Sequence, residues 1–172
     1  MHTLGPQDGD LIVHTGKGGA AAKAGHELTI EVTRWKATID DGAMTLSADP
    51  RSLRVLEGHG GMMELSDEDK DGISQTIDEE VMKGRPIEFR STKVEQRGSR
   101  IDVTGDLELF GFKRPIDFAL NVDETGRITG SAFVKQTDWK VKPFSALFGT
   151  LKVADVVEVS IDARVPTAVL HG

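Results

Sequence analysis

Carboxylates that could bind a metal ion are concentrated in the run "LSDEDKDGISQTIDEEV", residues 65–81. Asp67, Asp69 and Asp71 stand at alternate positions. A glycine follows them, and Asp78 occupies the twelfth place counted from Asp67. Oxygen ligands at this spacing, with a glycine in the sixth place, are the pattern of a calcium-binding EF-hand loop. Taken alone, the segment indicates binding of Ca²⁺.

The surrounding sequence argues against a calcium loop. The preceding "LEGHGGMM" cannot form the entering helix, and Ser74 stands where the loop needs an aliphatic residue. Ile73, Ile77 and Val81 recur at every fourth position, which predicts one apolar face of a helix inserted near residues 68–82. The acids at its start would cap the helix and complement its dipole. The segment is therefore predicted to be a helix and not a cation site.

The remaining candidates for chemistry have the wrong spacing. "TGKGG" at 15–19 has the glycines and lysine of a phosphate loop in the wrong order, so a strand connection is predicted there. His14, His26 and His59 share no spacing that would place them on one element, so no metal site is expected. The chain has no cysteine or tyrosine, no serine in a nucleophile elbow and no distinguishable acid–base pair. We expect no cofactor and no catalysis.

Length and charge restrict the class of protein. A chain of 172 residues suits a single domain, 1–172, with a core from about residue 10 to residue 166. The formal net charge of −7 argues against nucleic-acid binding, which relies on clustered Lys and Arg. The N-terminus lacks a basic region followed by an apolar stretch, and no run reaches the roughly 18 apolar residues that cross a bilayer. These features predict a cytoplasmic protein without stable membrane insertion.

Alternation of apolar and polar residues, the pattern of β-strands, dominates the chain. In "HELTIEVTRWKATI", residues 26–39, the apolar positions are even as far as Val32 and odd from Trp35 onward. One extra, unpaired residue changes the phase of a two-residue period in this way. The change near Thr33 and Arg34 therefore predicts a β-bulge that bends the strand sharply.

Turn signals separate the other strand-like runs and predict short antiparallel connections. The clearest are "DDG" at 40–42, "RGS" at 97–99 and "DETG" at 123–126. Roughly eight strands and one helix follow from them. Because closure removes free strand edges, we predict a mainly β fold, an eight-stranded antiparallel up-and-down (lipocalin-like) barrel with the helix inserted.

The apolar residues offer the clearest candidate for a function. An eight-stranded barrel is either filled by its own side chains or holds one small ligand. Aromatic residues make up only 5% of the chain, so stacking platforms for sugars or unstacked bases are scarce. The segment 139–153 gathers large apolar residues between two strands, which fits either a plug of core residues or an apolar lid.

The order of several motifs resembles the YceI family of lipid- or polyisoprenoid-binding barrels, in particular an actinobacterial-type branch. "GDLELFGFKRP" at 105–115 is similar to the family's Gly-x-Leu-x-x-x-Gly-x-x-Arg-Pro. "RPIEFRSTKV" at 85–94 follows the predicted helix, as a similar strand does in the family. Gly25 and His26 match the Gly-His of the family's second strand, and Asp155 precedes the last predicted strand.

This resemblance covers about residues 15–165 and implies a lipocalin-like barrel around a long amphiphile, such as a polyprenyl quinone or phosphate, a fatty acid or an amide. It implies non-catalytic binding, storage or transport of a long-chain lipid or isoprenoid, and it leaves a homodimer open. The alternative is a structural or stress-response interaction protein whose barrel is filled by its own side chains.

The residues expected to form the apolar tunnel and its lid come from the bulged strand, the middle strands and the segment after residue 138. They are Ile30, Val32, Trp35, Phe89, Leu107, Phe118, Leu120, Trp139, Phe144, Leu147 and Phe148. His26 is the candidate for a polar contact with a head group. Alternation does not say which face of a strand points inward, so each assignment depends on register.

Overall fold

The computed structural model describes residues 2–17, 26–40, 42–60, 66–109, 111–140, 145–146 and 151–165. Strands dominate this part of the chain, and every pairing between them is antiparallel, as the short connections predicted. The strands are β1 (His2–Leu4), β2 (Gly9–Lys17), β3 (His26–Val32), β4 (Trp35–Asp40), β5 (Ala43–Ala48), β6 (Leu53–Gly60), β7 (Ile87–Arg97), β8 (Arg100–Leu109), β9 (Phe112–Val122), β10 (Arg127–Lys135), β11 (Ser145–Ala146) and β12 (Leu151–Arg164).

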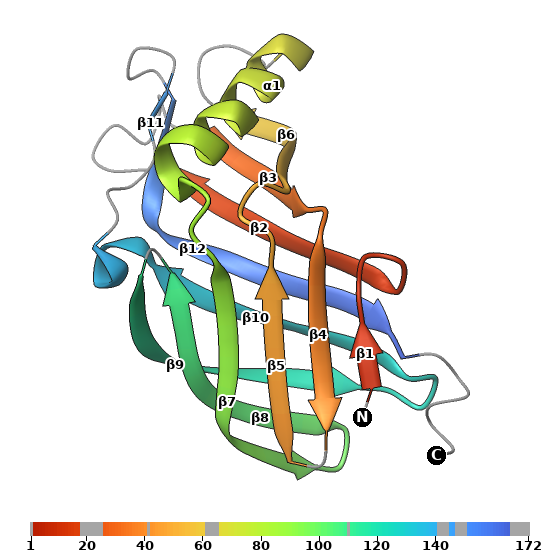
Figure 1. Cartoon of the computed structure of the whole chain (residues 1–172). Helices are drawn as coiled ribbons and strands as arrows, with labels where there is room; N and C mark the ends of the chain where they lie inside the picture. Colours follow the sequence, from red (N-terminus) through yellow and green to blue (C-terminus); the bar gives the residue numbers. More distant parts are fainter. Residues whose placement is uncertain are drawn as a thin grey trace.

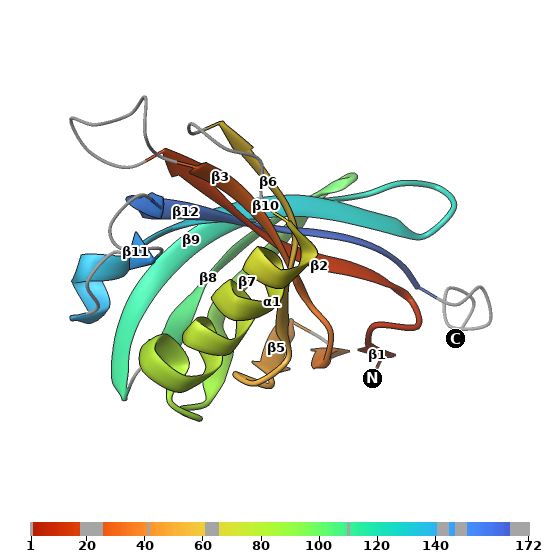
Figure 2. The same cartoon turned by 90° about the horizontal axis from the view of Figure 1, so that it is seen from above.

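The strands form one curled sheet, a half-barrel, with the order β1-β4-β5-β7-β8-β9-β10-β12-β2-β3-β6 (Figures 1 and 2). β11 lies off this path and pairs with β12. The predicted number of eight strands is not confirmed, because eleven strands of the described chain lie on the path. The predicted run 26–39 is divided by a corner into β3 and β4, and the short β1 was not predicted.

The corner between β3 and β4 lies where the apolar phase changes. β3 ends at Val32 and β4 begins at Trp35, and both residues are buried. Instead of a one-residue bulge, the chain interrupts the strand at Thr33 and Arg34. β3 then pairs with β2 and β6, whereas β4 pairs with β1 and β5. β4 and β3 lie near opposite ends of the strand order, and the chain connects them directly through this corner.

A helix forms where the four-residue period predicted one. It consists of α1 (Asp67–Thr76), followed without a break by the π-helix η1 (Ile77–Met82). Ser66 caps it, because its hydroxyl accepts from the Asp69 N–H while the Asp69 carboxylate accepts from the Ser66 N–H, both at 3.1 Å. Among the described residues, no helix is long and apolar enough to cross a membrane.

The acids of the calcium-like pattern all belong to this helix. Residues two positions apart in an α-helix point about 200° apart around the helix axis. Asp67, Asp69 and Asp71 therefore do not all point toward one ion. In the described part of the chain, no group of three or more His, Asp or Glu side chains is placed to hold a metal ion. The helix is instead tied to the sheet by Ser74, whose hydroxyl accepts from the Val55 N–H at 3.0 Å.

Gly105, the first residue of the family-like motif, is required by close packing between β7 and β8. A Cβ atom there would lie 2.4 Å from the Arg90 carbonyl oxygen and 2.6 Å from the Phe89 ring. The Phe89 ring also packs against Phe118, with 5.2 Å between ring centroids and 58° between ring planes. The glycine therefore leaves room for the Phe89 ring directly over β8. By contrast, Gly72 in α1 has open space around it.

Substituting these two glycines by alanine should change stability in opposite directions. Gly105→Ala overpacks the β7–β8 contact and should cost about 1–3 kcal/mol of unfolding free energy. Gly72→Ala removes helix-disfavouring backbone entropy without a clash and should add about 0.5–1 kcal/mol. Urea unfolding at equilibrium measures both changes. A stabilised Gly105→Ala variant would show that the close approach of β7 and β8 is absent.

Two carboxylates, Asp123 in the turn between β9 and β10 and Asp162 on β12, bind residues at the start of β10. Hydrogen bonds from the Thr125 hydroxyl and from the Arg127 N–H lower the pKa of Asp123. Across the sheet, the Arg127 guanidinium donates to both oxygens of Asp162, at 2.9 and 2.6 Å, and lowers the pKa of that carboxyl group. Both carboxylates therefore stabilise the fold in their charged form.

These interactions should make stability fall in acid. A carboxyl group with a lowered pKa contributes stability above its unfolded pKa of about 3.9, and the contribution is lost as pH falls through the lower folded value. Asp162→Asn should therefore be less stable than wild type at pH 7, and the difference should shrink toward pH 3. Thermal unfolding from pH 7 to 3 measures this. Asp138→Asn, at an exposed site, is the control, and a difference that stays constant with pH would contradict the assignment.

Candidate ligand cavity

Side chains from most of the strands enclose a cavity of about 260 Å³ inside the curled sheet. Along β9, Ile116, Phe118 and Leu120 border the cavity, whereas Lys113 and Asp117 between and before them are exposed. The two-residue period of a strand produces this alternation. The register of the sheet thus decides which face of each strand points inward, which the sequence had left open.

Six of the residues expected to line an apolar tunnel border this cavity. They come from β3, β7, β8 and β9 and are Ile30, Val32, Phe89, Leu107, Phe118 and Leu120. All except Phe118 are buried, and Phe118 is half-buried. Their role in binding stays a prediction.

The two tryptophans of the predicted site are buried but do not border the cavity. Trp139 ends the 3₁₀-helix η2 (Gln136–Trp139), and its Nε1 donates to the Leu107 carbonyl at 2.9 Å. Trp35 begins β4, and its buried Nε1 has no hydrogen-bond partner in the described part of the chain. The hydrogen bond attaches the Trp139 indole to the β8 backbone, and its role as plug or lid stays a prediction.

For four other predicted residues, the structure describes either no atoms or the backbone alone. Phe144, Leu147 and Phe148 fall outside the described residues. His26 is the first residue of β3, where its backbone lies opposite Gly60, but its side chain is not among those described. The head-group contact expected of His26 therefore stays a prediction.

The π-helix η1 contributes two cavity residues, of which the sequence pattern pointed to only one. Ile77 and Met82 both border the cavity and are both buried. They are five residues apart, which is the hydrogen-bonding interval of a π-helix. The α-helical period had predicted Ile77 for the apolar face, and Met82 was not among its positions.

The described cavity wall carries no ionisable side chain, and its polar groups are few. Thr15 is buried, and its hydroxyl accepts from the Leu28 N–H at 2.9 Å. The hydroxyl of Thr45 pairs with that of Thr38. Because burial of an unpaired charge is very costly, the part of a ligand enclosed here must be uncharged.

A serine and a histidine lie close together on the neighbouring strands β12 and β2. The Ser160 hydroxyl and His14 Nε2 are 3.3 Å apart, near the long limit of a hydrogen bond. Glu158 faces His14 across the two strands, but no carboxylate is hydrogen-bonded to His14 within the described ranges. His14 is exposed and does not border the cavity, whereas Ser160 is half-buried and does.

Asp155 positions η2 at one end of the cavity. Its carboxylate accepts from the Thr137 N–H at 2.9 Å and from the Thr137 hydroxyl at 2.5 Å. Asp155 was expected before the last strand, but it lies within β12, where the pairing with β2 shifts register between Val153 and Val157. The irregularity accounts for the error, because it interrupts the alternation from which the strand was predicted.

Comparison with known proteins identifies the family and finds solved structures with a similar fold. The model of the YceI-like domain family matches residues 19–165. The crystal structure of Burkholderia cenocepacia BcnA is similar with a TM-score of 0.62 and 15% identity, over 89% of this chain and 94% of that chain. A mutant CJ YCEI protein with a monobromobimane guest gives a TM-score of 0.52 and 13% identity, over 78% and 81%. No curated protein matches the chain. At these identities the solved structures establish the fold alone.

Proposed function

The chain belongs to the YceI-like family, and from this premise we propose that it binds, stores or carries an apolar ligand without catalysing a reaction. The observation that carries the proposal is the cavity, whose described wall is formed by aliphatic and phenylalanine side chains with a few hydroxyl and amide groups. The mutant CJ YCEI protein, which shares the fold, was solved with a small-molecule guest, monobromobimane. A cavity of this kind favours a carrier over the alternative of a barrel filled by its own side chains.

The size of the cavity limits what it encloses. Ligand pockets usually measure about 300–1,000 Å³. A cavity of about 260 Å³ lies just below this range. We propose that it receives the end of a lipid or isoprenoid chain, or the whole of a shorter one.

A charge placed in the cavity wall should abolish binding. Phe118→Asp puts a carboxylate beside the Phe89 ring, where it must remain hydrated or protonated, and affinity for an apolar chain should fall more than tenfold. Displacement of a fluorescent fatty-acid analogue measures the affinity. Glu95→Gln, on the outer end of β7, is the surface control and should bind as wild type does.

A second variant separates lost binding from lost folding. Ala132 borders the cavity and is half-buried, so Ala132→Phe fills space without adding charge. It should weaken binding while thermal unfolding stays cooperative. Unchanged affinity in both Phe118→Asp and Ala132→Phe would show that the ligand binds elsewhere.

Affinity should also depend on chain length in a limited range. Each methylene enclosed contributes about 0.8 kcal/mol, which is roughly fourfold in affinity. Across the n-alcohols from hexanol to hexadecanol, affinity should rise by about that factor per carbon until the cavity is filled and then level off. Calorimetric titration measures the series. A steep rise continuing to hexadecanol would show that more chain is enclosed than this volume holds.

A further inference from the structure

Arg114 lies where β9 leaves the cavity. Ile116, Phe118 and Leu120 border the cavity on alternate positions, and Arg114 is the next position in the same row. It lies directly opposite Leu107, which also borders the cavity. Arg114 itself is exposed and is not part of the cavity wall. Arg114 therefore places a guanidinium group in this row beyond its last cavity-lining residue, between Ile116 and the exposed Phe112.

Arg114 differs from most other arginines in having no partner. Arg34, Arg97, Arg100 and Arg127 each form an ion pair with a nearby carboxylate. Arg114 has no hydrogen bond or ion pair within the described part of the chain. Its guanidinium is thus available to an external anion, in a protein whose net charge is −7.

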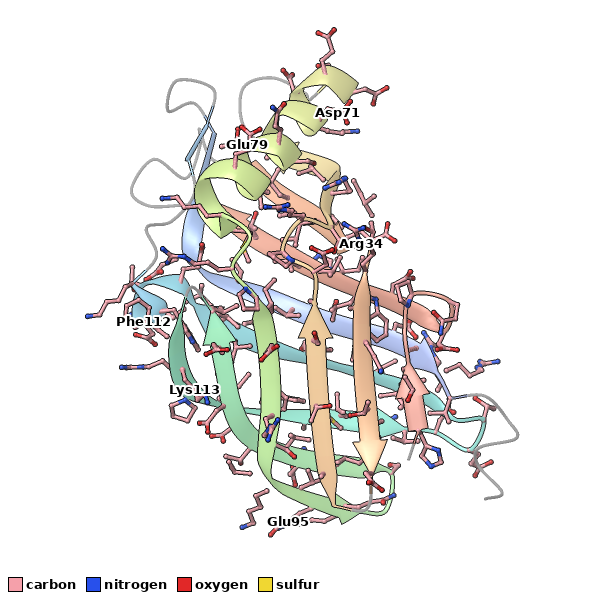
Figure 3. All side chains as sticks on the ribbon, viewed as in Figure 1. Arg34, Asp71, Glu79, Glu95, Phe112 and Lys113 are labelled. Carbon is pink, nitrogen blue, oxygen red and sulfur yellow. The ribbon has the colours of Figure 1, made fainter. Side chains whose placement is uncertain are left out.

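The backbone around Arg114 is restrained, and it is paired with a neighbouring strand, β8, on one side. Among the described residues, β9 pairs with β10 only from Ala119 to Val122, and β8 is the one strand described beside the half of β9 that contains Arg114. Pro115 is compatible with this half because a proline within a sheet requires an edge. A residue before proline is also held in extended conformation. Figure 3 shows Phe112 and Lys113, which precede Arg114, at the edge of the molecule.

From this geometry we propose that Arg114 binds the anionic head group, a carboxylate or a phosphate, of an amphiphile whose chain occupies the cavity. This inference rests on the proposed function and defines the ligand class further. The cavity excludes charge, so a charged head must stay at the rim. A guanidinium presents two parallel N–H donors to the oxygens of a carboxylate or phosphate.

Lys113 provides a matched comparison. It is the adjacent cation, but it lies in the opposite row of β9, directly across from Glu108. General attraction of anions to the protein surface would involve both residues equally. A head-group site at the end of the cavity requires Arg114 alone.

The test compares three ligands of equal chain length: decanoate, decyl phosphate and decanol. Isothermal titration at low salt measures each with wild type, Arg114→Gln and Lys113→Gln. Arg114→Gln should lower the affinity for one or both anions about tenfold while decanol binds as before. Lys113→Gln should bind all three ligands as wild type does. The larger of the two losses identifies the head group as carboxylate or phosphate.

Other outcomes overturn the inference, each in a recognisable way. An equal loss in Arg114→Gln and Lys113→Gln means non-specific attraction, and no loss in Arg114→Gln means that the head group lies elsewhere. In both cases binding of decanol that is still abolished by Phe118→Asp leaves the proposed function standing. Failure of wild type to bind any of the three ligands overturns the proposed function together with this inference.

Discussion

The rest of the structure depends on the backbone hydrogen bonds at the corner between β3 and β4. The Thr33 N–H and hydroxyl both donate to the Ser52 carbonyl at 2.8 Å, and the Asp49 N–H donates to the Arg34 carbonyl at 3.0 Å. Ser52 is fully buried and donates its hydroxyl to the Asp49 carbonyl at 2.8 Å. The corner between β5 and β6 is thereby locked to the corner between β3 and β4. With both turned together, the sheet must curl, and the curl creates the cavity.

The sequence indicates this corner because burial imposes a period of two on each strand. The apolar phase changes between Val32 and Trp35, and β3 and β4 separate there. The helix was predictable for a similar reason, since its apolar face repeats every fourth residue and Ser66 provides a cap. Phe89, Leu107 and Phe118, which were expected in one apolar site, border one cavity, and their role in binding stays a prediction. Local periodicity thus predicts much of the fold, whereas the inward face of each strand needed the register.

What the sequence does not predict depends on contacts between distant segments. The number of eight strands was not confirmed, in part because a corner divides the run 26–39, whose strand-like composition is continuous. Met82 reaches the cavity only because η1 adopts π-helical spacing. Trp139 resembles a lid residue by composition, yet its indole is fixed by the Leu107 carbonyl, 32 residues earlier. Gly105 is explained only once Arg90 and Phe89 lie against it. Neither periodicity nor composition contains such information.

The rim of the cavity beside Arg114 depends on the partial pairing of β9 with β10. An aliphatic wall distinguishes ligands by length and shape, and it discriminates poorly between head groups. Discrimination must come from polar residues at the rim. β9 separates from β10 before Ala119, and this separation makes Pro115 acceptable and leaves Arg114 exposed at the end of a cavity-lining row. A chain entering this cavity would therefore be oriented by the strand that encloses it, with its apolar end inside and its charged end at Arg114.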